Sequence, residues 1–447
     1  MKKIFFLLAI SFMMILASCS DDDDAATALM NVKVKLTLPA GIENVSLKDV
    51  PMTFSSGEMI YNAKTTEAGV AEFTVPAGVY TAAATSTQVI EGNAYYTLNA
   101  VKENITVNTA WETEKPVVLE MVASKASQVI IKEIYTGGTT NPETGKTANT
   151  DHYITLYNNS PATVSLENLA IGNTGANAYA PTTGFVQNGK LTYENEDWIP
   201  VTDGTFYFPE ALSIEPYSDV VVVLRSAIDH TQTNKASVDL SHADYVCYDP
   251  QSGYADPICY KAPSSNIPSS HYLKANKWGL MAYWFYSDNT PAFFIYQTDG
   301  KNVTDYFADA SLNMMPPMVP SPVYMSKKMS RSWILDAVDT YGLDFIGMNY
   351  KRMTADLDAG YVFYTLNKGY SIYRNVDKAA TEAIPGNKEK LVYNYSLGTQ
   401  DIENGSTDKS GIDAEASMKN GAKIIYMDTN NSTNDFHLRK ECAQRAK

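Results

Sequence analysis

Cysteine and histidine are scarce in this sequence, which has four cysteines and five histidines among 447 residues. No two cysteines stand at C-x-x-C spacing, and no cysteines and histidines repeat at the spacing of a structural zinc site. The motifs G-x-S-x-G and H-E-x-x-H and the phosphate-binding P-loop are also missing. These absences speak against a zinc module, a serine hydrolase, a zinc protease and a nucleotide-binding enzyme.

Basic residues are in the minority, with 35 Lys and Arg against 50 Asp and Glu and a formal net charge of -15. A chain of this charge is repelled by a phosphate backbone, so nucleic-acid binding is not expected. Charged residues make up only 19% of the sequence and hydrophobic ones 45%, which is typical of a globular rather than a disordered chain. Only one long apolar run occurs, at the start of the chain.

Isolated polar groups give weak signals for chemistry. His230 and His242 lie twelve residues apart among aspartates. They could hold a metal or act as a base, but no helix or turn fixes their spacing, so polar loop histidines are the favoured interpretation. Asp336 and Asp339 fall on a predicted helix and would face the same way, as on any solvated helix face. Residues 356–360 lack the third ligand and the closing Glu of a calcium loop.

The apolar run at residues 4–16 follows Met1-Lys2-Lys3 and is too short to span a bilayer comfortably. It fits the hydrophobic region of a signal peptide. The run closes with Leu-Ala-Ser before Cys19, which resembles the lipobox of bacterial lipoproteins. The resemblance implies a signal peptide over residues 1–18, lipid on Cys19 and a lipidated acidic tether over residues 19–30. The alternative is a plain secretory signal with an incidental cysteine.

A compact acidic run follows the cysteine. As a composition it is typical of a solvated tether. Its position directly after a lipidated cysteine resembles the surface-export signal of Bacteroidetes lipoproteins, which are displayed on the outer face of the outer membrane. The alternative is an outer-membrane lipoprotein that stays on the periplasmic side. The residues of the export signal are Ser20, Asp21, Asp22, Asp23 and Asp24.

Residues 31–122 carry short strand patterns separated by turn residues. Val32, Val34 and Leu36 alternate with polar residues, as in a half-buried strand. Residues 66–80 read T-x-x-G-x-A-x-F-x-V-P-x-G-x-Y, which resembles carboxypeptidase-regulatory-like and related transthyretin-like sandwiches. The resemblance implies a β-sandwich that serves as a spacer or stalk and has no catalytic role.

Residues 128–447 are predicted to form a larger β-rich domain. Strand patterns end in E-I-Y near residue 135 and in L-Y-N near residue 158, and V-x-L-x-x-L then follows. This order resembles a bacterial lamin-tail domain, an immunoglobulin-like fold. The core would span residues 128–230 with an insertion near 174–205. Relatives often carry Glu where Thr155 stands, so a role tied to that carboxylate is not expected.

The portion from about residue 125 onward resembles an uncharacterised Bacteroidetes lipoprotein family of unknown function. The resembling stretches are residues 238–244, 331–338 and 425–436. The last of them is a polar turn cluster that is expected to close the sheet from far away in the sequence. The resemblance bears on location and architecture more than on activity.

An aromatic segment at residues 278–296 gives the best functional signal. Exposed rings can stack on sugars or planar chelates and can anchor protein interfaces. The alternative is a strand hairpin whose rings fill the core. Cys247 and Cys259 bracket a short loop, and a disulfide is favoured over two unpaired thiols. The candidate ligand face comprises Trp278, Tyr283, Trp284, Tyr286 and Tyr296.

The sequence as a whole predicts a mainly β chain, with a small N-terminal β-sandwich followed by a larger β-rich domain with a lamin-tail-like core. The expected function is that of a non-catalytic, surface-exposed outer-membrane lipoprotein. It would bind a nutrient such as a sugar or chelate, or a partner protein, without a cofactor or metal. Lipoproteins with this export signal often accompany TonB-dependent transporters, so an accessory role follows from the resemblance. The alternatives are an adhesion or structural lipoprotein and, last, a hydrolase.

Overall fold

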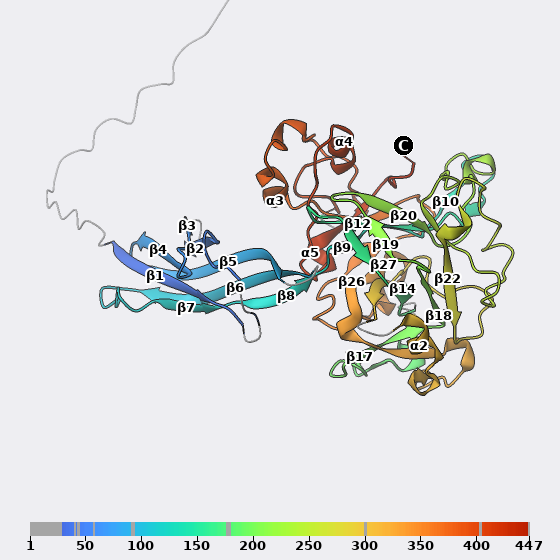
Figure 1. The fold of residues 1–447 in the computed structure, drawn as a ribbon, viewed down its shortest axis with the longest axis horizontal. Coiled ribbons are helices and arrows are strands. Elements are labelled where there is room, and N and C mark those ends of the chain that lie inside the picture. Colours follow the sequence, from blue (N-terminus) through green and yellow to red (C-terminus); the bar gives the residue numbers. More distant parts are fainter. Residues whose placement is uncertain are drawn as a thin grey trace, which may run out of the picture. The chain divides into compact units, whose positions relative to one another are not determined.

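The protein, seen as a computed structural model, is built mainly of β-strands, which confirms the predicted fold class (Figure 1). It forms two compact units, one of residues 1–90 and 96–124 and the other of residues 91–95 and 125–447. No helix among the described residues is long and apolar enough to cross a membrane. The structure describes residues 29–39, 42, 45–56, 59–90, 94–175, 180–298, 302–401 and 405–445.

The first unit packs two sheets around one core. Buried side chains from both sheets meet in it, including Val34 of one sheet and Phe54 of the other. The ring of Phe54 lies 5.2 Å from that of Phe73 and 4.6 Å from that of Tyr80. The sheet orders are β4 (Val70–Val75), β1 (Met30–Thr37), β7 (Val117–Glu120), and β3 (Met59–Lys64), β2 (Pro51–Ser56), β5 (Gly78–Ile90), β6 (Ala94–Val107), β8 (Val122–Ala126).

Strand β1 forms where the sequence alternates. Val32, Val34 and Leu36 are buried, whereas the lysines between them face outward, because successive side chains of a strand point to opposite faces. The turn before β4 requires Gly69, whose φ is +71° and whose added Cβ would meet Leu47 at 3.0 Å. Local pattern and turn chemistry therefore agree with the sandwich.

The second unit is organised by one sheet of eleven strands. The sheet curls, so that its first strand lies against β9: the amide of Ile131 donates to the carboxylate of Asp336 at 2.6 Å. Apolar side chains fill the inside of the curl. The strand order is β26 (Ile334–Val338), β23 (Phe293–Gln297), β14 (Leu169–Asn173), β18 (Gly204–Tyr207), β22 (Tyr272–Lys277), β21 (Tyr245–Cys247), β20 (Asp219–Val223), β12 (Tyr153–Asn158), β9 (Val129–Tyr135), β29 (Ser371–Arg374), β30 (Phe436–Arg439).

Chain segments that are distant in sequence complete this sheet. Strand β29 pairs with β9, and β30 then pairs with β29, so the segment directly after the polar cluster joins the sheet as predicted. The pairing of β9 with β12 shifts register between Thr155 and Leu156, which face Glu133 and Ile131. Lys132 is therefore the extra residue of a β-bulge.

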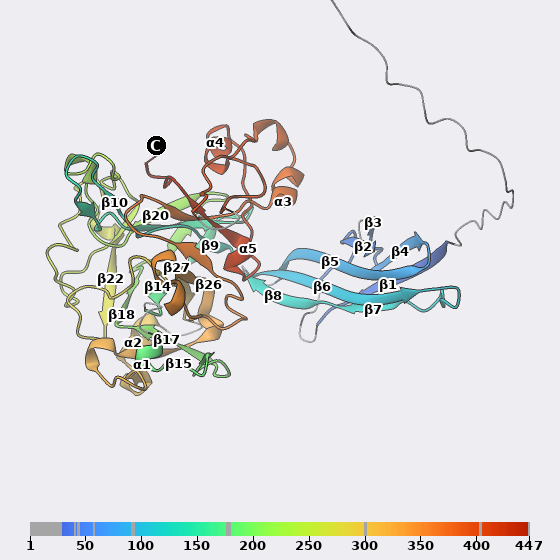
Figure 2. The ribbon, with the colours of Figure 1, turned by 180° about the vertical axis from the view of Figure 1, so that it is seen from behind.

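Smaller elements cover the two ends of the second unit (Figure 2). The segment between β14 and β18 contributes α1, β15, β16 and β17, and α3 and α4 lie at the opposite end. These further elements are β10 (Thr139–Thr140), β11 (Thr147–Ala148), β13 (Val164–Leu166), α1 (Ala180–Thr183), β15 (Val186–Gln187), β16 (Lys190–Leu191), β17 (Trp198–Thr202), β19 (Leu212–Ile214), α2 (Val303–Ala308), β24 (Asn313–Met314), β25 (Ser326–Ser330), β27 (Thr340–Gly342), β28 (Val362–Tyr364), α3 (Lys378–Ala383), α4 (Ala414–Lys419), α5 (Ser432–Asp435).

The predicted helix that carries Asp336 and Asp339 is wrong. Asp336 lies in strand β26, which pairs with β23, and Asp339 follows that strand. Both carboxylates are buried, at 5% and 0% exposure, and each meets an arginine, Arg374 and Arg352 respectively. Each aspartate is thus the charge partner of a buried arginine and does not belong to a solvated helix face. A buried ion is tolerated only with a partner of this kind.

Candidate functional site

Most of the predicted ligand face is buried, which is a correction to the sequence analysis. Trp284, Tyr286 and Tyr296 are exposed by 0%, 5% and 0%. Tyr296 lies in β23, a strand with neighbours on both sides and a packed core on each face, so neither face reaches solvent. The indole of Trp284 donates to the carbonyl of Gly204 at 3.0 Å inside the core. These three rings stabilise the fold.

Trp278 and Tyr283 are half-buried, and so is Phe285 between the two buried rings. The indole of Trp278 donates to the carbonyl of Val201 at 3.1 Å, and the Lys327 ammonium lies 5.6 Å from its ring. Trp278 is therefore fixed against its neighbours. Tyr283 and Phe285 are the rings of the segment that line open space.

A cleft of about 310 Å³ opens beside these two rings. Its wall combines aromatic side chains with an arginine and a carboxylate, and much of it comes from the predicted aromatic segment. The lining residues are Asn149, Arg225, Cys259, Tyr283, Phe285, Tyr286, Ser287 and Asp288.

Arg225 is the central charged group of the cleft. It follows the last apolar residues after β20 and is only 6% exposed. Its guanidinium donates to the carbonyl of Asn149 at 2.6 Å and to the carboxylate of Asp288 at 3.1 Å. Burial alone would lower the pKa of Arg225, but Tyr286 and Asp288 outweigh it and raise that pKa. Arg225 is thus a permanent cation held in place by fixed partners.

Asp288 is the matching anion, and its side chain is 29% exposed. Burial raises the pKa of Asp288, and the Arg225 guanidinium opposes this shift. One cation and one anion face the same cleft, so the site is close to neutral overall. Such a pair can offer hydrogen-bond donors and acceptors to a ligand without a strong preference for charge.

His152 lies behind the cleft and contacts it through Tyr286. Its Nδ1 is 2.7 Å from the Tyr286 hydroxyl, and its Nε2 has no partner among the described residues. Burial, with Arg225 adding to it, lowers the pKa of His152 well below its usual value. The imidazole is therefore neutral, and it fixes the Tyr286 ring as the floor of the cleft.

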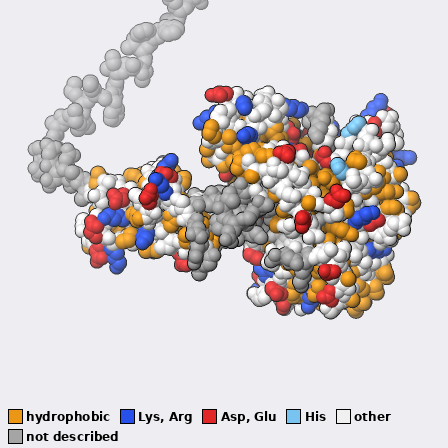
Figure 3. Space-filling view, in the orientation of Figure 1, with side chains coloured by type: hydrophobic (Ala, Val, Ile, Leu, Met, Phe, Trp, Pro, Cys, Tyr) orange, Lys and Arg blue, Asp and Glu red, His pale blue; other side chains and the backbone are white. Residues whose placement is uncertain are grey.

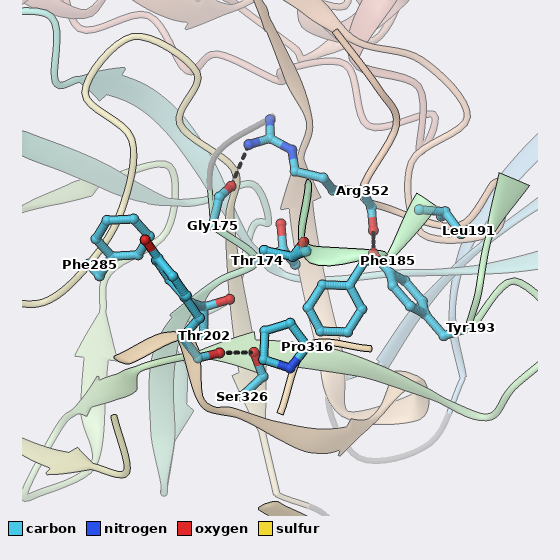
Figure 4. Close-up of a pocket in the computed structure, with 12 residues that line it drawn as sticks. Thr174, Gly175, Phe185, Leu191, Tyr193, Thr202, Phe285, Pro316, Ser326 and Arg352 are labelled. Carbon is cyan, nitrogen blue, oxygen red and sulfur yellow. Dashed lines mark hydrogen bonds between the residues drawn. The ribbon is translucent and has the colours of Figure 1, made fainter. Parts of the chain in front are cut away.

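Phe285 also lines a second, smaller cavity (Figure 4). Its volume is about 30 Å³, which leaves room for little more than a water-sized group. Figure 4 shows Arg352 donating to the carbonyl of Gly175, a bond of 2.6 Å, and the Tyr193 hydroxyl donating to the carbonyl of Arg352 at 2.7 Å. These bonds make this region a packed wall, and the larger cleft is the better ligand site.

The predicted disulfide between Cys247 and Cys259 is wrong in this structure. Both are free thiols and both are buried. Cys247 lies in β21 within the core, whereas Cys259 lies in an irregular segment. The backbone carbonyl of Cys259 accepts a hydrogen bond from the Ser226 hydroxyl at 3.0 Å. Burial raises the pKa of both thiols. A short loop in sequence does not bring two cysteines together when one of them belongs to a central strand.

The two histidines of interest, His230 and His242, take different roles. His230 is buried and its Nε2 lies 2.8 Å from the carbonyl of Ser226, whereas His242 is exposed beside Asn266. Across the described residues, no three His, Cys, Asp or Glu side chains gather as metal ligands. Asp358 accepts bonds from Ser432 and from the amide of Asp339, in line with the polar turn expected at residues 356–360.

Sequence reasoning missed Arg225 and Asp288. They are 63 residues apart, and only the fold brings them together. One signal was available, since an arginine directly after a run of buried apolar residues needs a partner. Figure 3 shows acidic and basic side chains scattered over the visible face, so no charged patch there competes with the cleft. Cys19 and the residues Ser20, Asp21, Asp22, Asp23 and Asp24 lie outside the described residues.

Comparison with known proteins yields a family and a related fold. No curated protein matches the chain. A crystal structure of a DUF4876 family protein from Bacteroides thetaiotaomicron VPI-5482 is similar, with a TM-score of 0.52, 20% sequence identity, and coverage of 91% of this chain and 94% of that chain. At this identity the likeness shows the fold alone. The model of the family described as "Protein of unknown function (DUF4876)" matches residues 215–442, just over half of the sequence, and the chain therefore belongs to this family.

Proposed function

We propose that this protein is a non-catalytic surface lipoprotein that binds a small, polar, uncharged ligand in the cleft around Arg225. One observation carries the proposal: Tyr283 and Phe285 stand half-buried beside a cleft of about 310 Å³ that also holds the Arg225–Asp288 pair. That volume lies at the lower end of the range for small-molecule sites, which are mostly apolar with a few fixed polar groups.

The chemistry of the cleft favours a sugar over a charged ligand. The apolar face of a sugar ring can pack on Tyr283 or Phe285, and its hydroxyls can both donate and accept hydrogen bonds. Arg225 supplies donors and Asp288 supplies acceptors within one wall. A carboxylate or phosphate would have to compete with Asp288 for the arginine, and a cation would meet the Arg225 charge. A planar chelate is the second ligand class that the rings could hold.

The location is proposed from the sequence. Cys19 would carry the lipid, and Asp21 to Asp24 would direct the protein to the outer face of the outer membrane. The first unit would act as a carboxypeptidase-regulatory-like stalk, and the second would have a lamin-tail-like core with large insertions. A ligand captured at the surface could then pass to a TonB-dependent transporter, for which this protein would be an accessory.

A glycan array probed with the labelled full chain tests the proposal. We expect the native chain to be retained on a subset of neutral oligosaccharides. Each of the single variants Tyr283→Ala and Phe285→Ala should lose retention on all of these oligosaccharides. Tyr393→Ala is the matched control, because Tyr393 is an exposed ring, at 38%, that lines neither cavity. Retention of both variants on the same glycans as the native chain would contradict the proposal, as would no retention of the native chain.

A further inference from the structure

Lys132 occupies an unusual position in the second unit. It is the bulged residue of β9, and its exposure is only 1%. Its side chain leaves the sheet on the face that is covered by the segment carrying α4, where Ile130 and Tyr157 also pack. A lysine ammonium is seldom buried this deeply without carboxylate partners.

Two carboxylates meet the Lys132 ammonium. Asp219, at the start of β20, forms an ion pair with it, and Glu415 of α4 lies 2.9 Å from Nζ. The strands β9 and β20 both flank β12, so the lysine side chain reaches across one strand to its partner. The side chain of Asp219 is 31% exposed and that of Glu415 is 19% exposed.

Three tyrosine rings enclose the same ammonium. Nζ lies 5.8, 5.7 and 5.9 Å from the ring centroids of Tyr157, Tyr373 and Tyr426. The Tyr373 hydroxyl donates to Glu415 at 2.7 Å and lies 3.0 Å from the Tyr426 hydroxyl. The rings keep water away from Nζ, and the hydroxyls fix the orientation of Glu415.

We propose that Lys132 and Asp219 become joined by an amide bond between Nζ and the side-chain carboxyl carbon, with Glu415 as the proton acceptor. An amine, a carboxyl group and a second carboxylate are the groups that amide formation needs. The fold holds all three in contact, and the tyrosine rings shield the Lys132 ammonium from bulk water. Orientation of this kind replaces the encounter of separate reactants.

The reaction is balanced by the loss of one water molecule. Nζ transfers a proton to Glu415 and attacks the carboxyl carbon of Asp219 with its lone pair. The resulting tetrahedral carbon expels one of the two Asp219 oxygens, which leaves as water after receiving two protons, the one held by Glu415 and a second from Nζ. Asp219 reacts as the carboxylate of the ion pair, so these two protons complete the water, the third proton of the original ammonium stays on the amide nitrogen, and Glu415 ends as the carboxylate it was at the start.

Glu415 is an ionised carboxylate in the ion-paired state, as a proton acceptor must be. Burial would raise the pKa of Glu415, but Lys132 outweighs this and holds the pKa at about 2, so the carboxylate is free to accept a proton. Burial disfavours the Lys132 charge, whereas Glu415, Tyr426 and Asp219 raise its pKa well above the usual value. Proton transfer to Glu415 must therefore precede attack, and the reaction is expected to be slow rather than instantaneous.

The bond would be a covalent cross-link within the eleven-stranded sheet. The described cysteines Cys247, Cys259 and Cys442 are free thiols and supply no disulfide for this purpose. It would close a loop between β9 and β20, whose end leads directly into Arg225. Such a cross-link constrains the unfolded chain as a disulfide does. It would also withstand reduction.

Peptide mapping of the purified full chain tests the proposal. After denaturation and trypsin digestion, we expect a branched peptide that contains Lys132 and Asp219 and is lighter than its two parts by one water. Trypsin should not cut after Lys132. Lys327, also 1% exposed but bonded to the carbonyl of Asp309 at 2.7 Å, is the digestion control, and cleavage should follow it. Cleavage after both lysines, with linear peptides of full mass, would overturn the proposal.

Variants separate the chemistry from the ion pair. Asp219→Asn should still form the bond but lose ammonia in place of water, so its branched peptide should have the same mass as that of the native chain. Lys132→Arg and Asp219→Ala should give only linear peptides, and Glu415→Gln should leave most of the chain uncrosslinked. A branched peptide that persists in Asp219→Ala would place the bond elsewhere and contradict the assignment. Peptide mapping measures covalent bonds in the denatured chain. A variant that folds poorly therefore does not affect the result obtained for the native protein.

Discussion

The guanidinium of Arg225 lies over the ring of Tyr286, with 5.0 Å between its Cζ and the ring centroid. This contact connects the end of β20 to the aromatic segment at residues 278–296. The Tyr286 ring, although buried, forms the floor of the cleft. Tyr283 and Phe285, which line the same cleft, are half-buried. A segment that otherwise fills the core thus leaves two rings at the edge of open space.

Trp284 and Tyr283 are adjacent in sequence but should respond differently to truncation. We expect Trp284→Ala to lower the free energy of unfolding by about 3–5 kcal/mol, because a fully buried ring and its contacts are lost. Tyr283→Ala should change it by less than about 1 kcal/mol, because its side chain is only half-buried. Urea unfolding monitored by circular dichroism measures both. Equal losses would show that Tyr283 is a core residue and unsuited to ligand contact.

The buried His437 should make the protein sensitive to acid. Burial, assisted by Arg439, lowers the pKa of His437 from 6.5 to about 3 in the folded chain. Because the folded pKa is depressed, the contribution of the neutral ring is complete above pH 6.5 and is lost as the pH falls from 6.5 to about 3.

The variant His437→Gln isolates this effect. Its urea midpoint should fall less steeply over that interval than the native one, whatever its value at neutral pH. Midpoints measured at a series of pH values give the comparison. Parallel curves for the two proteins would mean that His437 does not titrate as described.

The cysteines should be unreactive until the chain unfolds. In a Cys19→Ala variant, a thiol reagent should modify almost nothing under native conditions, since Cys247, Cys259 and Cys442 are buried. After denaturation without a reductant it should modify three thiols, one for each of these free cysteines. Modification of only one thiol would instead show that two of the three cysteines are bonded, and would support the disulfide between Cys247 and Cys259.

The proposed anchor and export signal can be separated by two substitutions. Cys19→Ala should release the protein from membranes, because the lipid attachment is lost. Replacement of Asp21 to Asp24 by Ala should leave it anchored but protected from protease added to whole cells. Cell fractionation and protease shaving measure these outcomes. Unchanged protease access in the aspartate variant would contradict the export signal.

Local patterns predicted the strands better than they predicted burial. The alternation of Val32, Val34 and Leu36 was enough for β1, since one face of that strand meets the core. Phe293 to Tyr296 form a continuous apolar run, and its burial on both faces depends on two cores, one on each face of the sheet, that are built from distant parts of the chain. Nothing local distinguishes such a run from a hairpin with an open face.

The candidate site shows the same limit. The aromatic segment was identified from sequence, and part of it does line the cleft. The choice of Trp284 and Tyr296 was wrong because exposure is a tertiary property. Arg225 and Asp288 could not be paired in advance, since their contact exists only after the sheet has formed around them.

Calorimetric titration of an array-positive oligosaccharide tests the central claim most directly. We expect saturable binding of one ligand per chain, and an affinity at least about tenfold weaker in Tyr283→Ala or Phe285→Ala, which corresponds to about 1.4 kcal/mol. Tyr393→Ala should bind like the native protein. Affinities that are equal in all four proteins would place the ligand elsewhere and contradict the assignment of the Arg225 cleft as the binding site.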